Sequence, residues 1–224
     1  MTAKEILTEL QALGSEKLKA QNIKKGAPSD NQYGVKMGDI RKVAKKVKKA
    51  DKSLARELWN TNIMEAQLTA ILLLKPDELS MDELNHFVET ISFDYVADWF
   101  NAYVVNKHPD KNKLMKLWID SDNKWALRSA WSIMANNIVR GADGLDLEKL
   151  LNQIEKEMPK VQPEVQWTMN FALAHSGIYH PAYRQRAIDI GNKLGIYKDY
   201  PVPRGCTSPF APIWIDEVVK KQKN

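Results

Sequence analysis

The sequence is poor in the residues that form covalent cross-links and metal sites. It contains a single cysteine, Cys206, which excludes an internal disulfide and a thiolate zinc cage. Its four histidines lack metal-ligand spacing, and the H-E-x-x-H, P-loop and G-x-S-x-G signatures are absent. We therefore expect no metal and no cofactor, and a reducing, cytoplasmic setting by default.

Long apolar runs are also missing. The longest, Ala70–Leu74, stops at Lys75 and Pro76, far short of the roughly 20 residues that cross a bilayer. The first residues include an acid and follow a helical pattern, which is unlike a signal peptide. We therefore expect no membrane partner.

Strict alternation of polar and apolar residues is absent, whereas a helical period runs through nearly the whole chain. Connections between the helical segments are short and carry proline or glycine. The pattern predicts helices at about residues 2–13, 15–25, 35–49, 51–59, 63–74, 80–91, 93–107, 110–119, 123–139, 147–157, 163–177, 181–194 and 210–222.

Helices of this length with short turns pack antiparallel to their neighbours. Pairs of them recur about every 30–40 residues, a spacing typical of helical-repeat solenoids. We predict an all-α solenoid that forms a single domain over residues 1–224 and acts as a monomer. A compact orthogonal bundle is the competing architecture.

Charge is unevenly distributed along the chain. Residues 1–60 hold 14 Lys and Arg against 7 Asp and Glu, whereas residues 61–100 hold 1 against 8. This asymmetry predicts a basic face beside an acidic one. The cations spaced to follow DNA phosphates, unless they form an ordinary solvated helix face, are Lys36, Arg41, Lys42, Lys45 and Lys46.

Three stretches together resemble the bacterial DNA alkylation repair proteins of the AlkD type: Tyr33–Lys42, Ser92–Phe100 and Trp125–Trp131. The tail Gly205–Trp214 resembles one branch of that group. The resemblance implies HEAT-like helix pairs in a C-shaped stack whose concave face binds double-stranded DNA. It also implies a monofunctional DNA glycosylase that hydrolyses the N-glycosidic bond of cationic N3- or N7-alkylated purines without a metal.

This reaction needs little general-acid catalysis, because a positively charged alkylpurine is already a good leaving group. What remains is to stabilise an oxocarbenium-like sugar and to position a water. A carboxylate that faces the anomeric carbon can do both. Aromatic faces near the sugar favour its positive charge, and an arginine on the adjacent phosphate fixes the register of the DNA.

The resemblance implies that Asp98 is the catalytic carboxylate. The family pattern has an aromatic residue four positions earlier, where this sequence has Asp94, an acid suited to the first turn of a helix. Moving the match by one residue brings Phe93 to the aromatic position but Ala97 to the catalytic one. A shifted helix, a Phe93 that reaches into the aromatic position, and an altered or lost activity are the open explanations.

Three further site residues are implied by the resemblance. Arg128 matches the arginine that contacts phosphate near the lesion, with a surface ion pair to Asp120 or Asp122 as the alternative. A second aromatic near the sugar falls on Phe171 or on Trp167 one turn earlier, although rings at this spacing are usually core residues.

Two functions are therefore open. The first is a DNA repair glycosylase that acts through Asp98, and the second is a non-catalytic HEAT-like module that binds DNA or another partner. The resemblance favours the first, whereas the acid at position 94 favours the second. We also expect residues 195–215 to cap the end of the stack, because their aromatic side chains offer large apolar areas to bury.

Overall fold

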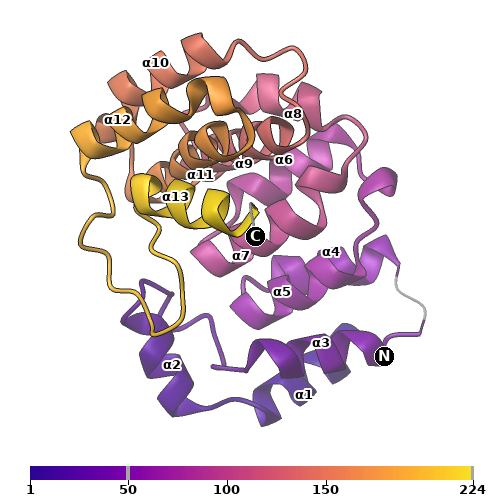
Figure 1. Cartoon of the computed structure of the whole chain (residues 1–224). Coiled ribbons are helices and arrows are strands. Elements are labelled where there is room, and N and C mark those ends of the chain that lie inside the picture. Colours follow the sequence, from indigo (N-terminus) through magenta and orange to yellow (C-terminus); the bar gives the residue numbers. More distant parts are fainter. Residues whose placement is uncertain (49–50, 223–224) are drawn as a thin grey trace. The chain divides into compact units, whose positions relative to one another are not determined.

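The computed structural model describes residues 1–48 and 51–222, and over these ranges it is built from helices, without strands (Figure 1). The predicted all-helical class is thus confirmed. Contacts divide the chain into two compact units, Met1–Lys111 (unit 1) and Asn112–Asn224 (unit 2). The expectation of one domain over 1–224 stays a prediction.

Two helices of unit 1 begin at a capping box. Thr2 and Glu5 form the predicted capping box at the first helix, and Ser80 and Glu83 form another at the sixth. The helices of unit 1 are α1 (Ala3–Ala12), α2 (Glu16–Ile23), α3 (Met37–Lys46), α4 (Lys52–Asn60), α5 (Met64–Leu73), η1 (Pro76–Glu78), α6 (Met81–Glu89), α7 (Asp94–Tyr103) and η2 (Val105–Lys107).

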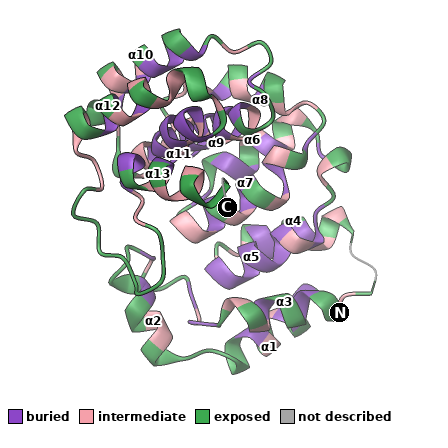
Figure 2. Ribbon diagram, in the orientation of Figure 1, coloured by how far each residue is buried: buried purple, intermediate pink, exposed green. Residues whose placement is uncertain are grey.

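Helix α5 forms the core of unit 1. Nearly all of its residues are buried, which Figure 2 shows as an almost continuous purple ribbon. Helices α1, α3, α4 and α7 pack against it. A helix that is apolar around its whole circumference is stable only when it is surrounded in this way.

One polar side chain of α5 fixes the segment that precedes α3. The carboxylate of Glu65, 0% exposed, accepts hydrogen bonds from the backbone N–H groups of Tyr33 at 2.9 Å, Gly34 at 2.8 Å and Val35 at 3.1 Å. On the other side, the N–H of Ser15 donates to the carbonyl oxygens of Tyr33 and Gly34, each at 3.1 Å. The segment is therefore held between α5 and the turn from α1 to α2.

This anchoring explains why α3 begins later than predicted. Gly34 has φ +77°, and a Cβ there would lie 2.4 Å from the carbonyl oxygen of Ser15. Lys36 keeps an extended backbone with φ −65° and ψ 139°, so the first helical hydrogen bonds run to its carbonyl oxygen and α3 begins at Met37. The helix also ends earlier than predicted, at Lys46, because Val47 has an extended backbone with φ −78° and ψ 96°; the predicted end, Lys49, lies outside the described residues.

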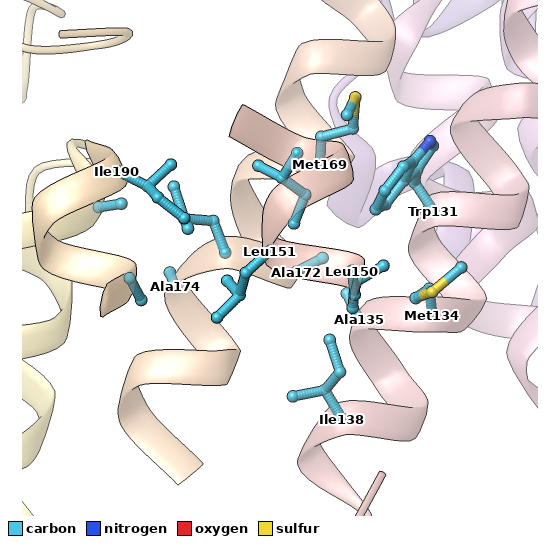
Figure 3. Packing of buried hydrophobic residues seen from close by; sticks show 14 of the residues in the cluster. Trp131, Met134, Ala135, Ile138, Leu150, Leu151, Met169, Ala172, Ala174 and Ile190 are labelled. Atoms are coloured by element: carbon cyan, nitrogen blue, oxygen red, sulfur yellow. The ribbon is translucent and has the colours of Figure 1, made fainter. Parts of the chain in front are cut away.

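Unit 2 is organised around the pair α9 and α11, which lie side by side. Their buried side chains meet those of α10 and α12 in one apolar cluster, part of which is shown in Figure 3. The helices of unit 2 are α8 (Lys111–Trp118), α9 (Lys124–Val139), α10 (Leu147–Glu157), η3 (Met158–Lys160), α11 (Pro163–Tyr179), η4 (Pro181–Tyr183), α12 (Arg184–Leu194) and α13 (Ala211–Gln222).

Within unit 2, the C-terminal segment packs against α11 and α12 through α13. A Cβ at Gly177 of α11 would lie 2.6 Å from Ile215, and one at Gly191 of α12 would lie 2.6 Å from Pro212. Phe210 is buried just before the helix. Glycine at these two positions therefore lets α13 approach closely, as expected of an element that covers apolar surface.

An ion-pair network between α4 and α6 makes the stability of unit 1 depend on pH. Glu83, with a side chain 16% exposed, pairs with Lys52 at 3.1 Å and with Arg56. Burial raises the pKa of Glu83, but hydrogen bonds from Ser80, Arg56 and Lys52 outweigh it and lower the pKa from 4.5 to about 2. The folded pKa is below the unfolded one, so this stabilisation is complete above about pH 4.5 and is lost between about pH 4.5 and 2.

Glu83→Gln should therefore lower the free energy of unfolding at pH 7 by roughly 2 kcal/mol, after allowance for the partial exposure of its partners. Urea denaturation between pH 7 and pH 2.5 measures this difference, which should shrink as the pH falls. Glu78→Gln, which removes an exposed pair with Lys75, is the control and should change little. A difference for Glu83→Gln that does not vary with pH would contradict this account.

Candidate nucleic-acid interface

Unit 1 contains a cleft of about 430 Å³. Two residues predicted from the sequence, Asp98 and Lys36, contribute to its lining. The lining comes from α2 and the turn after it, from the segment that leads into α3 and its first residue, and from α7: Leu18, Asn22, Lys25, Val35, Lys36, Met37, Tyr95, Asp98 and Trp99.

Three of these residues share one face of α7. Tyr95, Asp98 and Trp99 are three and four positions apart, the spacing that brings side chains together on a helix. Asp98 is exposed, and the two rings are half-buried. A carboxylate is thus flanked by two aromatic side chains in a cleft, an arrangement suited to a positively charged reaction centre.

Phe93, predicted to lie near the sugar, occupies a different environment. It is the residue just before α7, its side chain is only 3% exposed, and its ring packs edge-on against Tyr95 with centroids 4.8 Å apart. Its predicted role stays a prediction, but Tyr95 is the ring that lines the cleft. Tyr95 is three positions before Asp98, whereas the family pattern points to the fourth position and the shifted match to the fifth. The helical spacing of Tyr95, Asp98 and Trp99 is the sequence signal that identifies it.

Two cations beside the cleft are held by aromatic residues. The guanidinium of Arg41 lies 4.3 Å from the centre of the Trp99 ring and donates to the hydroxyl oxygen of Tyr103 at 3.4 Å. The ammonium of Lys25 donates to the hydroxyl oxygen of Tyr95 at 3.1 Å. Both side chains stay exposed, so their positive charges are positioned and remain accessible to an anion.

The predicted basic face lies on the outside of α3, where Lys36, Arg41, Lys42, Lys45 and Lys46 are all exposed. Lys42 pairs with Asp39 at 2.8 Å and Lys46 with Glu9 at 2.5 Å. Exposed pairs of this kind are worth only about 0–1 kcal/mol, so exchanging them for phosphate contacts costs little.

Arg128 lies inside unit 2 rather than on its surface. Its side chain on α9 is only 1% exposed, and it donates to the backbone carbonyl oxygen of Glu164. The alternative expected from the sequence, an ion pair with Asp120 or Asp122, stays a prediction. The phosphate contact of Arg128, and its location on one surface with Asp98 of unit 1, stay predictions.

Trp167 and Phe171 are half-buried on α11 and line a cavity of about 240 Å³ within unit 2. The ring of Trp167 contacts Tyr197 and Tyr200, and the ring of Phe171 contacts Trp214. Both predicted aromatics thus pack against the C-terminal segment. Their predicted place near a sugar stays a prediction.

Over residues 1–48 and 51–222, no group of three His, Cys, Asp or Glu side chains is arranged to hold a metal ion. In the same part of the chain, no helix is long and apolar enough to cross a membrane.

Comparison with known proteins identifies the fold and the family. One solved structure aligns with 99% of this chain and 95% of its own, with a TM-score of 0.80 and 21% sequence identity. It is described as "A new family of proteins related to the HEAT-like repeat DNA glycosylases with affinity for branched DNA structures". The present fold is therefore the HEAT-like helical-repeat fold, as predicted.

Comparison of the sequence with known families identifies the family. Residues 6–200 match the DNA alkylation repair enzymes, so this chain belongs to the DNA alkylation repair enzyme family. The resemblance noted from three stretches of sequence is confirmed. A search of curated proteins found no match.

Replacing Lys42, Lys45 and Lys46 together by alanine should weaken DNA binding about equally for all sequences, because phosphate contacts carry no base information. The dependence of log K on log salt should flatten by about 0.9 for each phosphate that is no longer neutralised by a lysine. Fluorescence anisotropy at several salt concentrations measures both quantities.

A charge-matched control removes three exposed lysines of unit 2, namely Lys149, Lys156 and Lys160. It should leave the salt slope nearly unchanged. If the α3 variant kept the affinity of the wild type, the face of α3 would be ordinary solvated surface.

Proposed function

We propose that this chain binds DNA through α3 and α7 of unit 1 and hydrolyses the N-glycosidic bond of cationic N3- or N7-alkylated purines. The observation that supports this most is the position of Asp98 in the cleft, flanked by Tyr95 and Trp99, beside cations that those rings hold. Membership of the DNA alkylation repair enzyme family supports the same reaction class.

The reaction would break the bond between C1′ of the sugar and the purine nitrogen. The bonding electron pair neutralises the positive charge of the alkylated base, which then leaves without needing a proton. The electron-poor sugar is stabilised by the negative charge of Asp98 and by the ring faces of Tyr95 and Trp99. Water adds to C1′ while Asp98 accepts its proton, which yields a free base and an abasic site.

The surrounding cations would position the strand. Lys25 contacts Tyr95 and Arg41 contacts Trp99, the two rings that flank Asp98, and the lysines of α3 extend the positive surface. Contacts to phosphate set the register of the DNA, so a sugar is brought to Asp98 without base readout.

A second function, binding of branched DNA without hydrolysis, is favoured by a specific observation. Asp94 is present where the family pattern has an aromatic residue, and Phe93 is packed in the core. The solved relative is described as having affinity for branched DNA structures. The same basic surface would serve this function, with Asp98 as a surface residue.

Release of N7-methylguanine from duplex and branched DNA, followed by chromatography, separates the two functions. For a glycosylase, Asp98→Asn should lower the rate at least about 100-fold while DNA affinity is kept, because a positioned acid–base group contributes about 10²–10⁴-fold. Asp77→Asn, at an exposed aspartate outside the cleft lining, is the control and should not change the rate.

Equal rates for the wild type and Asp98→Asn would rule out Asp98 as the reacting group. A wild-type chain that releases no base but binds branched DNA tightly would establish the second function instead.

A further inference from the structure

Helix α7 presents a row of aromatic side chains that continues past the end of the helix. Tyr95, Trp99 and Tyr103 are each four positions apart, so they lie on one face of the helix. The rings of Trp99 and Tyr103 pack together with centroids 5.5 Å apart. One further step of four positions reaches Lys107, which belongs to η2.

The first two rings of this row each hold a cation from another part of unit 1. Lys25, in the turn after α2, donates to the hydroxyl oxygen of Tyr95 at 3.1 Å. The guanidinium of Arg41, on α3, lies 4.3 Å from the centre of the Trp99 ring. A cation can cover only one face of a ring, and the reaction proposed above needs only the other face of Trp99.

Lys107 completes the row at its far end. Its ammonium lies 5.2 Å from the centre of the Tyr103 ring, a cation–π distance. The hydroxyl oxygen of the same tyrosine accepts the hydrogen bond from Arg41 at 3.4 Å. Tyr103 therefore contacts two cations, and the exposed side chains of Lys25, Arg41 and Lys107 follow one another along α7.

The spacing of the row matches the spacing of phosphates in one DNA strand. Four residues of an α-helix advance by about 6 Å. Consecutive phosphates of one strand are separated by a similar distance. An even row of three anions also exists only along a strand, because two strands that face each other across a groove offer a pair of phosphates and not a row.

We infer that Lys25, Arg41 and Lys107 bind three consecutive phosphates of one DNA strand. Asp98 comes between the first two rings of the row, so its carboxylate faces the sugar that lies between the first two phosphates. Lys107 binds the phosphate next to this pair. The inference rests on the proposed function and adds to it the register of the strand and one further DNA-binding residue, Lys107.

The charge of Asp98 supports this register. A phosphate placed directly at a carboxylate would be repelled, whereas an electron-poor sugar at the same place is attracted. The two phosphates that flank the sugar meet a cation on each side instead. Negative and positive groups of the protein thus alternate in the same order as sugar and phosphate along the strand.

Contacts with rings suit these three cations to phosphate binding. Lys42 and Lys46 of α3 are paired with carboxylates, which compensate part of their positive charge until those pairs break. A cation held by a ring keeps its full charge, and a guanidinium stacked on an indole still directs its N–H groups to the sides. Each cation of the row can therefore meet a phosphate while its ring contact persists.

A duplex with one pyrrolidine unit in place of a nucleotide fixes the register for a binding test. The pyrrolidine is a positively charged mimic of the oxocarbenium-like sugar and cannot be hydrolysed, so only affinity is measured. If Asp98 faces this sugar, the duplex should bind at least about ten-fold more tightly than one with a neutral tetrahydrofuran unit. Asp98→Asn should remove that preference.

Single phosphates of the pyrrolidine duplex are then made neutral by methylphosphonate linkages, one at a time, on either strand. In the wild-type chain, neutralising the phosphate that Lys107 contacts should weaken binding about three- to five-fold. Lys107→Gln should weaken binding of the unmodified duplex by the same factor. The two changes together should cost little more than either alone, because they remove the same contact.

This coupling should occur at one linkage only. For Lys107 it should lie on the strand that carries the pyrrolidine unit, next to the pair of linkages that flank the unit. Lys25→Gln and Arg41→Gln should couple to the two flanking linkages, one each.

Two matched variants control for charge and position. Lys107→Arg keeps the positive charge and should keep the coupling. Lys149→Gln, at an exposed lysine of unit 2, removes a charge elsewhere and should couple to none of the three linkages. Both positions are exposed, so the fold should be retained.

The outcomes distinguish the row from the proposed reaction. A preference for pyrrolidine DNA, with Lys107 coupled to no linkage or to one on the opposite strand, would overturn the row and keep the reaction. No preference would overturn the reaction and the register, and the Lys107 contact then depends on the salt slope, which Lys107→Gln should lower by about 0.9. A slope equal to that of the wild type would overturn this contact as well.

Discussion

The carboxylate of Glu65 lies inside α5 and accepts three hydrogen bonds from consecutive backbone N–H groups, Tyr33 to Val35. Burying a negative charge is unfavourable unless fixed donors replace its water, and here three N–H groups do so. The segment they belong to leads directly into Lys36 and Met37, which line the cleft, and into α3 with its exposed cations. One buried acid thus determines where the candidate interface begins.

Cations on the surface of unit 1 are also held in place, in this case by aromatic residues. Arg41 is held by Trp99 and Tyr103, and Lys25 is held by Tyr95. A cation that is already positioned loses less conformational entropy when it meets a phosphate than a free surface lysine does. The aromatic residues of α7 therefore serve twice, because they line the cleft and also position its cations.

The fold class could be predicted from the sequence because the helical period is local information. The capping box at Thr2 and the outward cations of α3 follow from the same local patterns. The family could be predicted from the order of three stretches, because that order can be recognised even where sequence identity is low. The late start of α3 could not be predicted, since it depends on a contact between Gly34 and a residue 31 positions away.

The candidate site was predicted only in part, for a related reason. Asp98 and Lys36 were found because the family pattern and the charge pattern point to them, and both line the cleft. Lys25 was missed because its hydrogen bond to Tyr95 joins residues 70 positions apart, whereas Tyr95 was missed because the family pattern points to the fourth and fifth positions before Asp98 and not to the third. Glu65 was counted simply as one acid in an acidic stretch, since burial cannot be deduced from charge alone.

The most direct test of this account is Glu65→Gln, with amide hydrogen exchange and DNA affinity measured on the same folded samples. An amide offers one acceptor oxygen in place of two, so exchange at residues 33–37 should become faster. DNA affinity should then fall several-fold, while exchange in unit 2 is unchanged. Faster exchange at residues 33–37 with the affinity of the wild type would contradict the claim that this segment forms part of the DNA-binding surface.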